Sequence, residues 1–411
     1  MEKACIRPRA RAITWMLTLV YFASYLMRIN FAVMIVKICS DMALSETDLA
    51  IVLTALTVAY GGGQLISGLL GDRIKPTLLI SLGLVTAVFC NALMFFAPTV
   101  PIMTAVWAVN GFAHSLLWPP IIHLLSTYIT DGEYGYANVR ISWGSSFGTI
   151  FLYLACPLLL TFLHWRTVIL CCACGGAAVL VLWLLLSRRL FDTPVRDVAP
   201  VAAGKREVGK PLPRSVVLPI LLIMLAILCQ GMLRDGVTNW MPSYMCEAFS
   251  LSEEQAILST VILAIFSVIS FAFFSFVNER LFREELACAG SAFAFATIAA
   301  ALLFALNFVV SSALISMLLM ALVVGCMHGV NLMLIAYVPR RFIPYNRVST
   351  FSGMLNSCTY IGASLSNVAF AAIAAAKGWE ATVLVWVAVA ALGTLLCFVA
   401  LPLWRRFYRG K

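Results

Sequence analysis

Long apolar runs recur along the whole chain of 411 residues, separated by short polar stretches. A helix needs about 20 apolar residues to cross a bilayer. Backbone amides in hydrocarbon must be satisfied within the segment, which makes helices the expected form of these runs. The pattern predicts twelve membrane-spanning helices, with an uncleaved first helix. Their expected ranges are 14–38, 50–70, 77–97, 102–129, 138–162, 167–187, 215–245, 255–277, 286–309, 312–337, 350–375 and 380–403.

The amino-acid composition favours a chain that has lipid as its main solvent. Hydrophobic residues make up 62% of the sequence and charged residues 11%, whereas soluble domains carry roughly 25% charge. So few charges could not cover a water-soluble globule of this size. We therefore expect an all-α polytopic membrane protein, without metal or cofactor. We expect membrane lipid around it and no nucleic-acid partner, because its basic residues form no folded basic domain.

Basic residues are distributed unevenly between the two sides of the expected membrane protein. With the N-terminus inside, only Lys37, Arg166 and Lys377 among the 28 Lys and Arg residues face outward, while Arg28 and Arg234 lie within spans. The other basic residues fall in the inside loops and at the termini. Positively charged loops are typically retained in the cytoplasm. The bias predicts that both termini are cytoplasmic, and the compact chain suits a bacterial cell (inner) membrane.

The two halves of the sequence repeat one pattern. In the first half, Arg28 is followed after 16 residues by Leu-Ser-Glu and after 44 residues by Asp72-Arg73. In the second half, Arg234 is followed after 17 residues by Leu-Ser-Glu and after 45 residues by Glu279-Arg280. A polar, basic stretch separates the halves. Such parallel repeats are typical of transporters. We expect six-helix bundles over 1–187 and 215–411, joined by a cytoplasmic linker over 188–214.

Two arginines occupy unusual positions inside apolar spans. Arg28 lies about midway along the first span, and Arg234 lies at the equivalent place in the seventh. An arginine at the bilayer centre costs about 2.5–3.5 kcal/mol on insertion scales, and such residues mark functional sites by default. Their planar guanidinium groups match phosphate or carboxylate in a bidentate way. The pair therefore indicates an anion site.

The alternative is an internal ion pair. Asp235 is the acid at the same depth, but side chains adjacent on a helix point in different directions. Asp235 could pair with Arg28 or Arg234 across a cavity and cannot neutralise both. A formal charge of +1 remains, which again favours a bound anion.

Local motifs point to a known family. The loop Gly-Leu-Leu-Gly-Asp-Arg at 68–73 resembles the signature loop of the major facilitator superfamily, so Gly68, Asp72 and Arg73 are expected to form a gating loop. A sharper resemblance covers nearly the whole chain and is to the organophosphate:phosphate antiporters, the glycerol-3-phosphate and hexose-phosphate transporters. The matching stretches are Tyr25-Leu-Met-Arg-Ile-Asn-Phe31, Ala59-Tyr-Gly61, Trp118-Pro-Pro120, Leu233-Arg-Asp-Gly236, Trp240-Met-Pro-Ser-Tyr244, Met333-Leu-Ile335 and Tyr360-Ile-Gly362.

This resemblance implies the superfamily fold of two pseudo-symmetric six-helix bundles, and a phosphate bound by Arg28 and Arg234. It also places Tyr21 and Tyr25 beside the phosphate. The chain departs from the glycerol-3-phosphate transporter at four positions, which include Ile29 in place of a lysine, Asn239 in place of an acidic residue and two candidate site residues. Gln64 replaces a lysine on the second helix, and Ser145 replaces a histidine on the fifth. These departures leave the identity of the substrate open.

Several further side chains are candidates for the substrate site. His114 on the fourth span is echoed by His328 on the tenth, and in the superfamily fold helices one, four, seven and ten line the cavity. A histidine there could bind substrate or carry a proton. Spacings of three or four residues place further polar groups on the same helix faces, although ordinary packing explains such stripes as well. These further candidates are Trp118, Asn331, Asn356 and Tyr360.

Three functions remain in view from the sequence. The first is a secondary transporter, expected to be monomeric, that moves a small organic anion such as a phosphate ester, with exchange for inorganic phosphate implied by the resemblance. The second is a proton-coupled symporter of a carboxylate or sugar acid, which would use Asp235, His114 and His328. The third is a ligand sensor on a transporter fold. A membrane enzyme is disfavoured because the sequence offers no nucleophile–base constellation.

Overall fold

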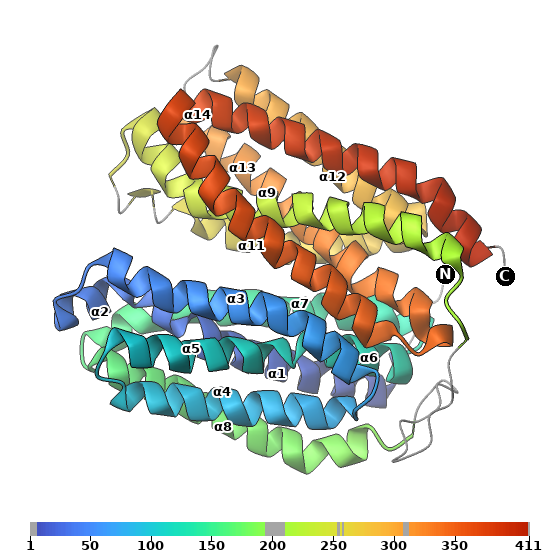
Figure 1. Ribbon diagram of the computed structural model, residues 1–411, viewed down its shortest axis with the longest axis horizontal. Coiled ribbons are helices and arrows are strands. Elements are labelled where there is room, and N and C mark those ends of the chain that lie inside the picture. The colour runs from blue at the N-terminus through green and yellow to red at the C-terminus, as the bar shows by residue number, and fades with distance from the viewer. Residues whose placement is uncertain (1–5, 194–209, 253–254, 257–258, 307–311, 410–411) are drawn as a thin grey trace. The chain divides into compact units, whose positions relative to one another are not determined.

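The computed structural model describes residues 6–193, 210–252, 255–256, 259–306 and 312–409. Eleven helices in these ranges are long and apolar enough to cross a membrane. The last of them, α14 (Val348–Arg409), is interrupted at Gly378, where φ is +79°. Only glycine adopts such a φ readily, so α14 comprises two crossings and the total reaches the twelve expected. The prediction of an all-α polytopic membrane protein is confirmed (Figure 1).

The chain divides into two compact units. Unit 1 comprises Met1–Lys210 and Phe342–Met354, and unit 2 comprises Pro211–Arg341 and Leu355–Lys411. The predicted domain limits of 1–187, 188–214 and 215–411 stay a prediction, and residues 194–209 of the linker lie outside the described residues. The short segment Phe342–Met354, which includes the start of α14, belongs to the first unit although it lies late in the sequence.

Unit 1 is a helical bundle in which sequence-distant helices pair. Helix α1 packs against α7 and α8, α3 packs against α5, and α4 packs against α5 and α8. Its helices are α1 (Pro8–Val33), α2 (Ile35–Met42), α3 (Glu46–Gly71), α4 (Pro76–Phe96), α5 (Val100–Ser115), α6 (Trp118–Tyr128), α7 (Asp131–Leu160) and α8 (Trp165–Leu190).

Unit 2 repeats part of this arrangement. Helices α11 and α12 both pack against α13, as α3 and α4 pack against α5 in unit 1, and α9 also packs against α13. The remaining elements are η1 (Arg214–Val216), α9 (Val217–Phe249), α11 (Val261–Val277), η2 (Asn278–Phe282), α12 (Glu285–Leu306), α13 (Ala313–Asn331), η3 (Leu332–Tyr337) and η4 (Val338–Tyr345).

Two predicted spans of unit 1 are each divided into two α-helices. The first is divided at Met34 into α1 and α2. The fourth, predicted as one helix over 102–129, is divided into α5 and α6. Pro119 and Pro120 lie in the first turn of α6. Proline has no backbone N–H to donate, and inside a helix its ring clashes with the carbonyl group of the residue four positions earlier. The prolines therefore explain why the fourth helix breaks just before them.

Local sequence signals set the helix ends. At the start of α3, the Ser45 hydroxyl accepts a hydrogen bond from the backbone N–H of Asp48, and the Asp48 carboxylate accepts one from the backbone N–H of Ser45. This capping box satisfies two amides that the helix itself cannot. Pro8 and Pro76 stand in the first turns of α1 and α4, where the missing N–H costs nothing.

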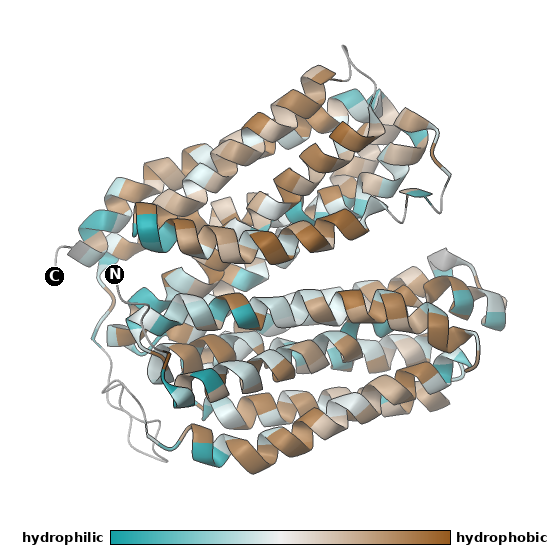
Figure 2. Ribbon diagram, turned by 180° about the vertical axis from the view of Figure 1, so that it is seen from behind, coloured by the Kyte–Doolittle hydropathy of each residue, from teal (hydrophilic) through white to brown (hydrophobic). Residues whose placement is uncertain are grey.

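Hydrophobic residues, brown in Figure 2, run along the helices of both units. Many of their large apolar side chains are exposed. Phe96, Leu154 and Phe162 are each more than 70% exposed. Water would disfavour such a surface, whereas acyl chains solvate it. The exposed apolar residues therefore fit helices whose outer faces contact lipid.

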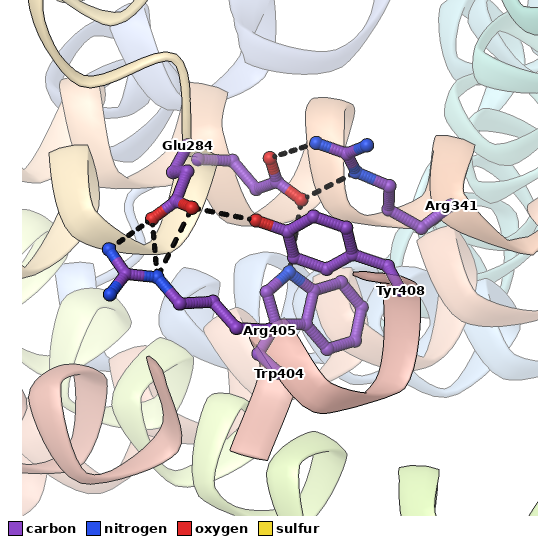
Figure 3. A network of polar contacts seen from close by, with 6 residues as sticks. Glu284, Arg341, Trp404, Arg405 and Tyr408 are labelled. Carbon is purple, nitrogen blue, oxygen red and sulfur yellow. Dashed lines mark hydrogen bonds and ion pairs between the residues drawn. The ribbon is translucent and has the colours of Figure 1, made fainter. Parts of the chain in front are cut away.

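Charged residues in unit 2 gather at the ends of helices (Figure 3). Glu285 accepts two hydrogen bonds from Arg341 at 2.9 Å and one from the indole of Trp404 at 3.0 Å. The neighbouring Glu284 is bound by Arg405 and by the hydroxyl of Tyr408. This network ties the start of α12 to η4 and to the end of α14.

Candidate functional site

In unit 1, the side chain of Arg28 lies against two aromatic rings. Its guanidinium carbon is 4.2 Å from the ring centroid of Tyr25, one turn earlier on α1, and 4.7 Å from that of Tyr60 on α3. Contacts of this kind contribute about 0.5–2 kcal/mol each. They use the ring faces, whereas hydrogen bonds to an oxyanion use N–H groups in the guanidinium plane. The ring contacts are therefore compatible with anion binding.

The predicted tyrosine stripe of α1 continues this aromatic surface. Tyr21 lies 5.3 Å from Tyr25 between ring centroids and 5.0 Å from Trp118 of α6. The break between α5 and α6 invalidates the argument that Trp118 shares a face with His114 on one continuous helix. The indole of Trp118 nevertheless reaches the α1 stripe. His114 is 2% exposed and lies within electrostatic range of Arg28.

Gln64 and Ser145, the two candidate site residues that depart from the glycerol-3-phosphate transporter, differ in their surroundings. Gln64 is fully buried on α3, one turn after Tyr60, and neither atom of its amide has a hydrogen-bond partner among the described residues. A buried amide without a partner costs about 1–3 kcal/mol, which favours a ligand or water beside it. The hydroxyl of Ser145 donates instead to the carbonyl oxygen of Ser142 on its own helix at 2.6 Å.

A buried asparagine network lies next to Arg28 and was not predicted. The Asn30 amide donates to Asn91 at 2.8 Å, and both Asn91 and Asn110 donate to the carbonyl oxygen of Met27, at 2.9 and 3.0 Å. All three asparagines are 0% exposed. The network fixes the turn of α1 that carries Arg28 to α4 and α5. The sequence signal that could have predicted this network is the presence of three asparagines within apolar spans.

In unit 2, the side chain of Arg234 pairs with its sequence neighbour. Its Nε donates to Oδ1 of Asp235 at 2.6 Å, and its Nη2 donates to Oδ2 at 2.9 Å. The expectation that adjacent side chains point apart is therefore wrong for this pair. The long arginine side chain bends back along α9 far enough to reach the carboxylate. Tyr360 of α14 contributes a ring whose centroid is 5.9 Å from the guanidinium carbon.

The other predicted residues of unit 2 lie on neighbouring helices. His328 packs edge-on against Phe271 at 5.2 Å between centroids and lies within electrostatic range of Arg234 and Asp235. Asn331 is the last residue of α13, one turn after His328, and is half-buried. Asn356 lies on α14, one turn before Tyr360, and is 7% exposed.

Arg28 and Arg234 belong to different units, so their convergence on one ligand stays a prediction.

A second buried amide was also missed. Gln230 lies one turn before Arg234 on α9 and is 0% exposed. It donates to the carbonyl oxygen of Met327 at 3.1 Å and accepts from the hydroxyl of Thr359 at 3.3 Å. Gln230 thus connects the turn before Arg234 to α13 and α14, much as the asparagine network connects α1 in unit 1.

The expected gating loop contacts the start of α14 within unit 1. The carboxylate of Asp72 accepts backbone N–H bonds from Ser349 at 2.9 Å and Thr350 at 2.8 Å. A carboxylate at a helix N-terminus satisfies free amides and complements the helix dipole. Arg73 is exposed. A Cβ atom on Gly68 would lie 2.7 Å from the carbonyl oxygen of Ser349, so a larger residue there would push the start of α14 away.

Comparison with known proteins decides the family. The sequence profile described as Major Facilitator Superfamily matches residues 17–367. The chain belongs to this superfamily. This protein is therefore an integral multi-pass membrane transporter of the superfamily and not an enzyme, and the predicted fold of two pseudo-symmetric helical bundles is confirmed.

Individual relatives of this superfamily protein are distant. It is 26% identical to the glycerol-3-phosphate transporter of Bacillus subtilis (strain 168) over 374 residues, covering 84% of this chain and 81% of that one. It is 21% identical to the phosphoglycerate transporter protein of Salmonella typhimurium, covering 87% and 82%. Among solved structures, a bacterial homologue of the iron transporter ferroportin matches with a TM-score of 0.75 at 13% identity, covering 95% and 99%. That likeness concerns the fold alone.

Proposed function

We propose that this protein is a secondary transporter of a small organic anion of the phosphate-ester class, and that it works by alternating access. The observation that carries the proposal is Arg28, a permanent cation within the apolar helix α1, which lies against the rings of Tyr25 and Tyr60. The relatives from Bacillus subtilis and Salmonella typhimurium, named for glycerol-3-phosphate and phosphoglycerate, support a phosphorylated substrate.

The energetics favour an anion as the partner of this site. Placing arginine in the bilayer centre costs about 2.5–3.5 kcal/mol, and two ring contacts of about 0.5–2 kcal/mol each recover part of this cost. A phosphate group offers charge-assisted bidentate hydrogen bonds that are roughly twice as strong as neutral ones. Substrate held jointly by Arg28 and Arg234 would draw the two bundles together, which is the expected step of alternating access.

The proposal includes an orientation and a location. Both termini would lie in the cytoplasm of a bacterial cell, because the basic loops fall on that side. The protein would act as a monomer in the cell (inner) membrane. Exchange for inorganic phosphate is the mode of transport that the resemblance to the organophosphate:phosphate antiporters implies.

Proton-coupled symport is the second candidate. It is favoured by the positions of His328 and Asp235, a histidine and a carboxylate that both lie within electrostatic range of Arg234. Liposomes distinguish the two modes. Phosphate inside the liposomes should accelerate uptake of labelled glycerol 3-phosphate in an antiporter, whereas an imposed proton gradient should drive uptake in a symporter.

Substitution of Arg28 by lysine tests the anion site. Arg28→Lys keeps the charge but loses the planar fork, so we expect uptake to fall by about tenfold or more. Arg140→Lys is the matched control, because Arg140 also lies over a tyrosine ring, that of Tyr136 at 3.5 Å, elsewhere in unit 1. Wild-type uptake by the Arg28→Lys protein, at equal expression, would contradict the proposal.

A further inference from the structure

The guanidinium fork of Arg234 is already occupied by a carboxylate. Asp235 accepts from both Nε and Nη2 of Arg234, at 2.6 and 2.9 Å, so the pair is bidentate. The side chains are 15% and 27% exposed, respectively. This is the geometry by which a guanidinium binds a phosphate or carboxylate ligand. Asp235 therefore occupies one of the two edges through which the guanidinium of Arg234 binds an oxyanion, the edge formed by Nε and Nη2.

An anion that approaches Arg234 also approaches the charge of Asp235. Attraction to the arginine and repulsion from the carboxylate both scale with the charge of the ligand. Since the two groups lie within hydrogen-bonding distance, their fields nearly cancel for a ligand beside them. A second negative charge on the ligand then gains little from Arg234. The three charged residues at this depth, Arg28, Arg234 and Asp235, sum to a formal charge of +1.

Two further groups among the described residues lie near the pair. They are the ring of Tyr360 on α14 and the imidazole of His328 on α13, which itself packs against Phe271. On α9, the hydroxyl of Thr238 donates to the carbonyl oxygen of Arg234. Asp235 is the carboxylate that contacts Arg234 directly, and it lowers the share of the arginine's charge that a ligand feels.

We propose that Asp235 is a specificity-determining residue that tunes the site toward singly charged anions and against doubly charged ones. This inference rests on the proposed anion transport and names the charge form of the substrate. The preferred ligands are the singly protonated form of a phosphate monoester, or a sulfate ester, sulfonate or carboxylate with one charge. Replacement of Asp235 by a neutral residue converts the site to one that favours dianions.

Two isosteric probes separate ligand charge from ligand shape. Methyl phosphate is mostly dianionic at pH 8, because the second pKa of phosphate esters is about 6, whereas methyl sulfate carries one charge at every accessible pH. The dissociation constants of both probes are measured calorimetrically for the purified full-length protein at pH 8. We compare the wild type with Asp235→Asn, Asp235→Ser and Asp235→Glu, after size-exclusion chromatography has shown that each variant is folded.

The ratio of the two dissociation constants is the decisive quantity. In Asp235→Asn and Asp235→Ser, we expect the preference for methyl phosphate over methyl sulfate to increase by about tenfold or more, from the loss of one nearby charge. Asp235→Glu keeps the carboxylate and should keep the wild-type ratio. Glu247→Gln, a carboxylate-to-amide change at an exposed position of the same helix, is the matched control and should also leave the ratio unchanged.

Two results would count against the inference in different ways. If both probes bind but the ratio is the same in Asp235→Asn, Asp235→Ser and the wild type, Asp235 does not set charge selectivity and the inference alone is overturned. If none of the proteins binds either probe, the anion site itself is wrong and the proposed function fails with it.

Discussion

Arg28 and Arg234 occupy equivalent places in the two halves, yet their environments differ. Arg28 lies against the aromatic rings of Tyr25 and Tyr60, which contact the face of its guanidinium group. Arg234 is bound through two hydrogen bonds by Asp235, which neutralises it. A repeated residue thus has different chemistry in the two units. The aromatic rings beside Arg28 do not repel an approaching anion. The carboxylate of Asp235 does repel it, and so weakens the attraction of the anion to Arg234.

The polar supports of the two arginines differ as well. In unit 1, three buried asparagines connect α1, α4 and α5 and meet at the carbonyl oxygen of Met27. In unit 2, the single side chain of Gln230 makes the corresponding contacts to α13 and α14. Unit 1 therefore holds its arginine through a larger network. Substitutions that act on one unit and not on the other test whether the two arginines are held differently.

The largest expected difference in stability comes from removing each arginine charge. Arg234→Gln leaves the carboxylate of Asp235 without its partner in a mostly buried place, which should cost about 2–4 kcal/mol of stability. Arg28→Gln loses ring contacts but also loses the cost of a charge in the membrane, so we expect a change within about 1 kcal/mol. Thermal unfolding in one detergent compares both. The double variant Arg234→Gln/Asp235→Asn should recover part of the loss, and equal destabilisation by the two single variants would refute the difference.

The next largest effect concerns the amide networks. Asn91→Leu removes the acceptor for Asn30 and two bonds to backbone carbonyls, so we expect a loss of about 1–3 kcal/mol. Gln230→Leu in unit 2 breaks fewer bonds and should cost about 1 kcal/mol. Midpoints of thermal unfolding give the ranking. A larger effect of Gln230→Leu than of Asn91→Leu would mean that unit 1 is not the more firmly braced of the two.

The aromatic setting of Arg28 predicts an effect on substrate affinity. Tyr60→Ala removes one ring contact of about 0.5–2 kcal/mol, which corresponds to a rise in KM of about 2- to 30-fold. Tyr60→Phe keeps the ring face and should transport almost as the wild type does. Uptake into liposomes across a range of substrate concentrations gives both values. If Tyr60→Phe were as impaired as Tyr60→Ala, the hydroxyl rather than the ring face would be the important group.

The smallest expected effect concerns Asp72 at the start of α14. Asp72→Ala removes the acceptor for two backbone N–H groups, and the loss of a helix cap typically costs about 0.5–2 kcal/mol. Asp72→Asn keeps a capping oxygen and should cost less. Thermal unfolding measures the stability, and uptake measures whether transport changes by a few-fold. An equal loss in both variants would argue that charge, and not capping, is what Asp72 supplies.

Much of the fold followed from the sequence because lipid imposes a simple rule on apolar runs. Each run had to form a helix, and all twelve crossings are present. The breaks within the first and fourth spans were missed because hydropathy does not register them, although Pro119 and Pro120 carried a signal for the second. Gly378, which separates the last two crossings, lies in the short gap that the pattern had left between them.

The candidate site was predictable where a charge stood out against an apolar background. Arg28 and Arg234 were visible for that reason, and so was Asp235. A pair of Asp235 with Arg28 or with Arg234 was one of the alternatives, and the structure has the pair with Arg234. Its direct geometry along one helix was not expected, because spacing rules describe where Cβ atoms point and not where a long side chain can bend. Tyr60, Asn91 and Gln230 were missed although Tyr60 lies in a family stretch and Asn91 and Gln230 are polar residues within apolar spans. Their roles depend on which helices pack together, and a single sequence does not contain that information.

A double-mutant cycle on Arg28 and Arg234 tests the central claim most directly, namely that both arginines bind one anion. The measurement is the dissociation constant of glycerol 3-phosphate for the wild type, Arg28→Gln, Arg234→Gln and the double variant. If the arginines share a ligand, their contributions are coupled, and the double variant binds clearly tighter than the product of the two single losses would allow. Independent, purely additive losses, or wild-type binding by either single variant, would contradict the account.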